Sequence, residues 1–114
     1  MLHDVKKSVW DAAETCQRIQ AFTTGKTLET YLTDLQLRLT VERLFEILGE
    51  AFKRIEGAAP SFRDAVPEMG KIIGMRNRLI HGYDRVDHVT VWDAVQVHVP
   101  VLAAKLAAWL KENG

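Results

Sequence analysis

The chain has 114 residues, of which 47% are hydrophobic and 26% are charged, as in an ordinary soluble globular domain. This length predicts a single domain over residues 1–114. Fifteen basic and fifteen acidic residues cancel, which argues against a protein that coats polyanions through a large basic excess.

The cysteine, histidine and hydropathy patterns exclude further classes of protein. The one cysteine, Cys16, cannot form an intrachain disulfide, so a disulfide scaffold is excluded. The four histidines show no metal-ligand spacing, and we expect neither a metal nor another cofactor. The N-terminus is charged and the longest apolar stretch is broken by Lys105, so we expect a cytoplasmic protein without membrane contact.

Apolar residues at spacings of three and four predict three long helices. The first should end before Gly25, and the third should begin near Pro67, which suits a first helical turn. Thr27, Thr30 and Tyr31 predict a short helical turn between the first two. The expected helices cover residues 4–22, 35–55 and 67–82.

The last segment, residues 86–110, carries two competing patterns. Alternating valines from Val95 to Val101 are typical of a strand, whereas spacings of three and four from Trp92 to Trp109 are typical of a helix. We predict a helix, because a lone strand has no partner. Thr90 and Asp93 form a plausible capping pair at its start. The helix should be kinked at Pro100, although two nearly collinear helices remain an alternative.

These elements predict an all-α fold, an up-and-down bundle of four to five helices. A bundle of this size has a modest core, and three tryptophans are many for it. Association of two copies would bury additional apolar surface, so we expect a homodimer.

One arginine interrupts the apolar stripe of the third helix. The stripe consists of Met69, Ile72, Ile73, Leu79 and Ile80, and the position between its two halves holds Arg76. A permanently charged guanidinium on an apolar face is costly unless an anion meets it. One interpretation is an internal ion pair with Glu42, Glu46 or Glu50; the other is a site for an anionic ligand.

Polar residues that suit phosphate chemistry surround Arg76. His81 precedes the expected helix end at Gly82 and can transfer protons near neutral pH. Asn77 lies four residues before His81 on the same face. Arg76 and His81 are about 140° apart on an ideal helix. Fraying at the helix end, the long arginine stem or a second copy across a twofold axis would each bring the two groups together.

The stretch Arg76-Asn77-Arg78-Leu79-Ile80-His81-Gly82-Tyr83 matches the Arg-x4-His-x-Tyr motif. On this motif the chain resembles HepT-like proteins of the HEPN superfamily, and the resemblance extends over nearly the whole chain. It includes the second-helix stretch from Val41 to Ala51 and the segments Val91-Trp92 and Val99 to Leu102.

The resemblance implies a metal-independent endoribonuclease toxin with an active site in a homodimer cleft. By this resemblance Arg76 binds the scissile phosphate and His81 is the general acid or base. Asn77 orients the phosphate or the histidine, and Arg78 is a supporting, phosphate-orienting residue. The ribose hydroxyl of the RNA attacks the adjacent phosphorus. Tyr83 is the expected site of AMPylation by an MntA-type nucleotidyltransferase antitoxin, which would block the cleft.

Charge and chemistry leave other functions open. Residues 63–88 include five basic and four acidic side chains, which is only a weak basic excess. We therefore expect selective or weak RNA binding. The same residues fit a non-catalytic binding module that serves a separate nucleotidyltransferase by gripping nucleotide phosphate. A purely structural dimeric bundle is the third hypothesis, and it requires an internal partner for Arg76.

Overall fold

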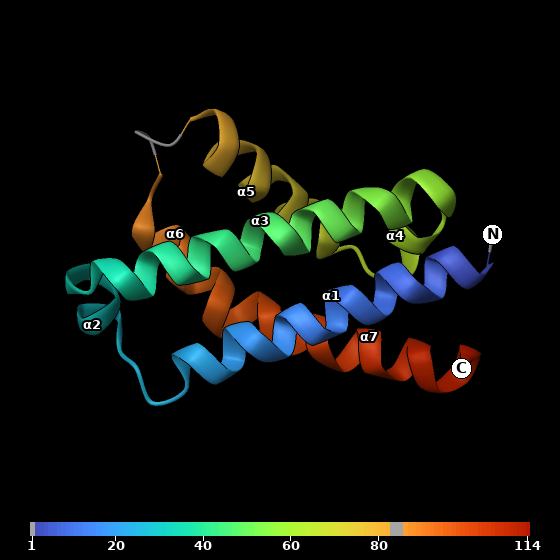
Figure 1. Ribbon diagram of the computed structural model, residues 1–114, viewed down its shortest axis with the longest axis horizontal. Coiled ribbons are helices and arrows are strands. Elements are labelled where there is room, and N and C mark those ends of the chain that lie inside the picture. Colours follow the sequence, from blue (N-terminus) through green and yellow to red (C-terminus); the bar gives the residue numbers. More distant parts are fainter. Residues whose placement is uncertain (1, 83–85) are drawn as a thin grey trace.

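The computed structural model describes residues 2–82 and 86–114, and these residues form helices joined by short loops, with no strand (Figure 1). The all-α prediction is therefore confirmed. The elements in chain order are α1 (Leu2–Thr23), α2 (Leu28–Thr33), α3 (Leu35–Ala58), α4 (Phe62–Ala65), α5 (Met69–His81), α6 (His88–Asp93), the π-helical segment η2 (Ala94–His98) and α7 (Val99–Asn113).

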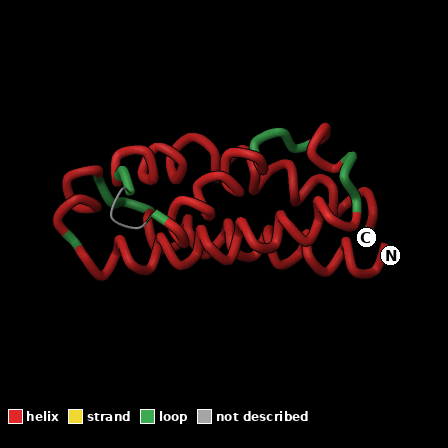
Figure 2. Tube along the Cα trace, turned by 90° about the horizontal axis from the view of Figure 1, so that it is seen from above, coloured by secondary structure: helices red, strands yellow, loops and turns green. Residues whose placement is uncertain are grey.

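Within residues 2–82 and 86–114, four long helical spans run alternately up and down. Helix α1 packs against α3 and α7, and α3 also packs against α5. The start of α1 and the end of α7 lie together at one end of the bundle, and the end of α5 and the start of α6 lie toward the other (Figures 1 and 2). The described part of the chain measures 42 × 29 × 19 Å. The molecule is elongated, and the end of α5 and the start of α6 lie on the same side of its middle as α2 (Figure 1).

The first two long helices, α1 and α3, begin and end near the predicted residues, and α2 is the predicted short turn between them. Gly25 has a φ of +78°, a left-handed conformation that glycine adopts without penalty, and it follows the end of α1. The hydroxyl of Thr27 accepts a hydrogen bond from the backbone N–H of Thr30 at 3.1 Å and caps α2. Asp34 caps α3 in the same way through the N–H of Leu37, at 3.0 Å.

The core lies along α3, whose apolar face is buried over the whole length of the helix. Residues from α1 and α5 meet this face, and residues of α7, which packs on α1, belong to the same hydrophobic cluster. Burial of large side chains of this kind is the main source of stability in a small bundle. The largest fully buried side chains of this cluster are Tyr31, Phe45, Phe52, Ile19, Leu48, Ile55, Met69, Ile72, Leu102 and Leu106.

Helix α5 starts later than predicted. Pro67 lies in a turn, in which its carbonyl accepts a hydrogen bond from the backbone N–H of Gly70 at 3.3 Å. Regular α-helix begins only at Met69. The stripe is also shifted, because Ile80 is 41% exposed whereas Met75 is buried. The short helix α4 was not predicted, since four residues are too few to show a periodicity.

The last segment is helical from His88 to Asn113, so the helix prediction is confirmed over the strand alternative. The predicted cap is wrong. The carboxylate of Asp87 accepts from the N–H groups of Val89 and Thr90, and the helix therefore begins before Thr90. Immediately before Pro100 the helix widens into η2, where the N–H of Val99 bonds to the carbonyl of Ala94. A wider turn accommodates the proline ring, which clashes with the carbonyl four residues earlier.

Within residues 2–82 and 86–114, no helix combines the length and the apolar character that a bilayer crossing requires.

Candidate active site

Arg76 lies at the contact between α5 and α3 and is half-buried. Its Nη1 group donates a hydrogen bond to Oδ1 of Asn77 at 3.1 Å. Its Nε atom is buried and has no hydrogen-bond partner among the described residues. A buried unpaired donor on a charged group is unfavourable. The bond to Asn77 holds the Arg76 side chain in place, but no described group pairs with its Nε–H.

The internal ion pair expected under one interpretation is not formed. No carboxylate in the described part of the chain lies within 4.0 Å of the Arg76 guanidinium, and the interpretation through Glu42, Glu46 or Glu50 is therefore wrong for these residues. Glu42 instead faces His88, with 3.8 Å between Oε2 and Nδ1. The positive charge of Arg76 is left available for an anion that the described residues do not supply.

Three polar side chains of the motif line an open pocket at the end of α5. Asn77, Arg78, His81 and Gly82 line this pocket, which has a volume of about 430 Å³. The side chains of Asn77, Arg78 and His81 are all exposed. An imidazole, an amide and a guanidinium around open space can contact a phosphodiester from solvent. The structure thus brings three of the predicted residues together in one chain.

Arg76 does not line this pocket. His81 is still helical and is the last residue of α5, so the helix does not fray before it and the separation of about 140° persists. Of the three ways to unite the two groups, the arginine stem and the second copy remain. Asn77 connects the two sides, since it bonds to Arg76 and also lines the pocket with His81.

Arg78 lies on the side of α5 that faces α6. Besides the pocket at His81, it lines two smaller hollows of about 230 and 270 Å³, and Met75 and Thr90 line both of these with it. The backbone carbonyl of Arg78 accepts the N–H of Gly82 and ends the helix. Arg78 therefore borders the approach to His81 from the side of α6.

The remaining predicted site residue, Tyr83, lies outside the described residues, as do Asp84 and Arg85. In the sequence it follows Gly82. The AMPylation prediction for Tyr83 therefore stays a prediction.

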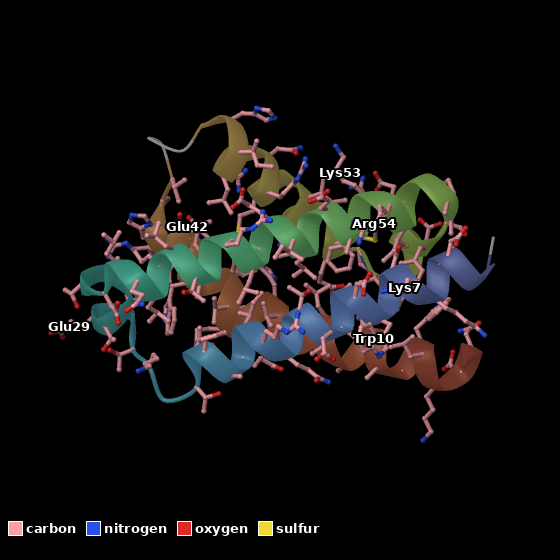
Figure 3. All side chains as sticks on the ribbon, in the orientation of Figure 1. Lys7, Trp10, Glu29, Glu42, Lys53 and Arg54 are labelled. Atoms are coloured by element: carbon pink, nitrogen blue, oxygen red, sulfur yellow. The ribbon has the colours of Figure 1, made fainter. Side chains whose placement is uncertain are left out.

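A second polar cluster, which sequence reasoning missed, lies beneath the start of α6. Glu42 is buried on α3 on the side of α6 (Figure 3). Burial raises the pKa of its carboxyl group, against the opposing effects of His88 and Arg38. Tyr31 is fully buried with its hydroxyl unpaired among the described residues, and its ring packs on Trp92 with centroids 5.1 Å apart. A glutamate inside the apolar pattern of residues 35–55 is the signal that could have located this cluster.

Metal ligands do not gather anywhere in the described ranges: no group of three or more His, Cys, Asp or Glu side chains is placed to hold an ion. The sole cysteine, Cys16, is buried in the core, and burial raises the pKa of its thiol to about 12. It therefore remains a neutral thiol, not a thiolate nucleophile.

Known proteins match this chain over most of its length. A protein of Thermococcus cleftensis named "Probable ribonuclease HepT" is 35% identical over 97 residues, covering 83% of this chain and 86% of that protein. Two proteins of Methanocaldococcus jannaschii, "Putative RNase MJ1216" and "Putative RNase MJ1380", are 29% and 31% identical, covering 96% and 85% of this chain and 89% and 88% of their own lengths.

The comparison with solved structures gives no significant match. The family described as "Ribonuclease HepT-like" matches residues 12–108, a range that includes α3, α5 and the whole Arg76–His81 segment. The chain therefore belongs to the HepT-like ribonuclease family of the HEPN superfamily.

Proposed function

We propose that this protein is the toxin of a toxin–antitoxin pair and cleaves RNA internally, without a metal, in the cleft of a homodimer. The observation that carries the proposal is the state of Arg76. Its guanidinium is half-buried, its Nε is unpaired, and no carboxylate of the described residues neutralises it. A phosphate of the substrate would supply the missing negative charge with the geometry that guanidinium prefers.

His81 is the proton-transfer group of the proposed reaction. It is exposed at the pocket shared with Asn77 and Arg78, where a phosphodiester has access. The attacking 2′-oxygen forms a bond to phosphorus and loses its proton to a base, while the bond from phosphorus to the 5′-oxygen breaks and that oxygen takes up a proton. The products are a 2′,3′-cyclic phosphate and a free 5′-hydroxyl. One histidine from each protomer would serve as base and as acid.

Arg76 and Asn77 supply the electrostatic part of this reaction. The negative charge on the nonbridging phosphate oxygens grows as the 2′-oxygen attacks, and a fixed guanidinium stabilises that charge without reorganisation. Because Nε is buried, the end of the guanidinium with its two Nη groups faces the ligand, and Asn77 fixes one of these groups. The neutral amide of Asn77 orients the arginine without cancelling its charge.

A second copy of the chain completes the proposed site. Arg76 and His81 lie on different faces of α5, and Ile80, next to both, is 41% exposed although it is apolar. Ile80 follows Arg76 by four residues and so shares its face. Covering this face with the partner copy would bury Ile80 and bring the partner's motif toward the same cleft. This arrangement supports the homodimer part of the proposal.

Tyr83 provides the proposed means of control. An AMP group on its phenol would add a phosphate and a base to the residue that follows Gly82 in the sequence. That phosphate would compete with RNA for the same cationic groups. A partner nucleotidyltransferase of the MntA type would carry out this modification with ATP and would thereby act as the antitoxin.

The decisive experiment is cleavage of a mixed-sequence single-stranded RNA pool by the purified protein in the presence of EDTA. We expect products with cyclic phosphate ends, and no cleavage where the ribose next to the cut is replaced by deoxyribose. Arg76→Ala should lower the rate about 10²–10³-fold and His81→Ala about 10²–10⁴-fold. Expression of the parent, but of neither variant, should arrest growth.

Matched controls separate the motif from its surroundings. Lys71→Ala removes an exposed positive charge from the same helix, and His98→Ala removes a histidine from η2; both should cleave like the parent. Equal cleavage by Arg76→Ala and His81→Ala would refute the assignment of these residues. Binding of nucleotide and a partner nucleotidyltransferase without any cleavage would favour the non-catalytic binding module. Mass spectrometry of Tyr83 after incubation with ATP and the partner tests the modification.

A further inference from the structure

Helices α3 and α5 are in close contact where Gly49 faces Arg76. A Cβ atom built onto Gly49 would lie 2.5 Å from Cβ of Arg76, 2.9 Å from its Cγ and 3.3 Å from the carbonyl oxygen of Ile72. Distances this short between carbon atoms are strongly repulsive. Only glycine at position 49 therefore allows α5 to lie at its observed distance from α3.

This tight contact is a property of Gly49 and not of the helical glycines in general. A Cβ on Gly57, also in α3, would meet nothing within 4 Å. A Cβ on Gly74, in α5, would have only the outer end of the Arg78 side chain nearby, at 4.0 Å. Glycine in a helix interior is destabilising by about 1 kcal/mol relative to alanine. Gly49 is buried in the middle of α3, so a close approach is the compensating reason for its presence.

We propose that Gly49 is a positioning residue for the active site, because its missing side chain forms the seat for the stem of Arg76. Cβ and Cγ of the arginine rest against the bare backbone of α3, which places Nε below the surface. Asn77 then fixes Nη1 from the outer side. With its stem and its tip both held, the guanidinium loses little conformational freedom when a phosphate binds.

The inference rests on the proposed ribonuclease function, in which Arg76 contacts the scissile phosphate. In Gly49→Ala the new methyl group would push Cβ of Arg76 outward. A shift of about 1 Å in a charge-stabilising group is enough to lower the rate about 100-fold. Since the lost interaction belongs to the transition state, kcat and kcat/KM should fall together, by about tenfold or more per folded molecule. Gly57→Ala and Gly74→Ala should cleave RNA at the parent rate.

A stability cycle tests the contact independently of activity. Gly49→Ala should lower Tm by several degrees in the parent. In an Arg76→Gly background the clashing Cβ and Cγ atoms are gone, so the same substitution should leave Tm unchanged or raise it. An Arg76→Lys background keeps both atoms and should keep the loss in Tm. The double substitution also remains informative should Gly49→Ala alone fail to fold.

The outcomes separate this inference from the proposed function. If folded Gly49→Ala cleaves RNA with parent kcat and kcat/KM, Gly49 does not position Arg76. If the loss in Tm is as large with Arg76→Gly as in the parent, the seat is not formed by this contact. If the parent protein cleaves no RNA, the proposed function fails, while the Tm cycle still decides whether Gly49 seats the Arg76 stem.

Discussion

Asn77 accepts a hydrogen bond from its neighbour Arg76, with 3.1 Å between Oδ1 and Nη1. Consecutive residues point about 100° apart on a helix, so this bond runs around the surface of α5 from the Arg76 face toward the His81 face. Asn77 also lines the pocket with His81. A single uncharged side chain therefore joins the phosphate-binding and the proton-transferring halves of the proposed site.

The charge of residue 77 should matter more than its size. In Asn77→Asp the new carboxylate would form an ion pair with Arg76 and repel the substrate phosphate. Asn77→Ala would lose only the hydrogen bond, an effect of about 10- to 100-fold on kcat/KM for RNA. We expect Asn77→Asp to be the less active of the two. Asn113→Asp, which makes the same change at the end of α7, should retain full activity. Equal activities of Asn77→Asp and Asn77→Ala would show that residue 77 does not act through Arg76.

Stability should depend on pH through the buried Glu42. Burial raises the pKa of this carboxyl group, while His88 and Arg38 oppose the rise and Glu46 adds to it. An acid whose pKa is raised on folding stabilises the fold while protonated, and that contribution is lost as pH rises from the ordinary glutamate value through the raised one. Glu42→Gln should therefore be more stable than the parent at neutral pH.

Urea denaturation across this pH range tests the Glu42 prediction. The stability difference between Glu42→Gln and the parent should vanish below the ordinary glutamate pKa and grow as pH rises. Glu50→Gln, an exposed change on the same helix, serves as the control and should show no such trend. A parent more stable than Glu42→Gln at neutral pH would mean that the contact with His88 outweighs the burial of the charge.

Tyr31 should tolerate the loss of its hydroxyl. The oxygen is buried and has no partner among the described residues, while the ring stacks on Trp92. Tyr31→Phe keeps the ring and removes an unpaired polar group, so it should stabilise the fold by about 1 kcal/mol. Thr23→Val is the matched contrast, because its buried hydroxyl donates to the carbonyl of Ile19 at 2.7 Å, and its loss should destabilise by a similar amount. Thermal unfolding measures both, and a lower Tm for Tyr31→Phe would contradict the prediction.

The sequence was sufficient for the fold class because apolar spacing reports directly on helical burial. It was less reliable at helix starts, where single hydrogen bonds decide. Residue preferences at helix starts predict Pro67 and Thr90, yet a turn holds Pro67 outside α5 and the carboxylate of Asp87 starts α6 earlier. The π-helical turn before Pro100 depends on how a bulky ring is accommodated in three dimensions, and residue spacing carries no signal for that.

The sequence names candidate residues for the site but not their arrangement. The motif identified Arg76, Asn77, Arg78 and His81, and the spacing correctly placed Arg76 and His81 on different faces of α5. The contact of Gly49 with Arg76 joins two helices and depends on an absent side chain, so no local pattern states it. A glycine within a strong helical pattern was the available signal, since such a residue needs a packing reason.

A charge at position 80 should separate the two protomers. Ile80 is 41% exposed on the Arg76 face of α5, where the proposed partner copy would cover it. Ile80→Asp should give a monomer in sedimentation velocity experiments, with an unchanged helical circular dichroism spectrum, because an unpaired carboxylate is strongly disfavoured in an apolar interface. RNA cleavage should fall with the dimer fraction, since each cleft needs two motifs. Val101→Asp, at a site on α7 that is 40% exposed, should stay dimeric and active. A dimeric Ile80→Asp would place the interface elsewhere, and a monomeric but active parent would remove the shared cleft from the mechanism.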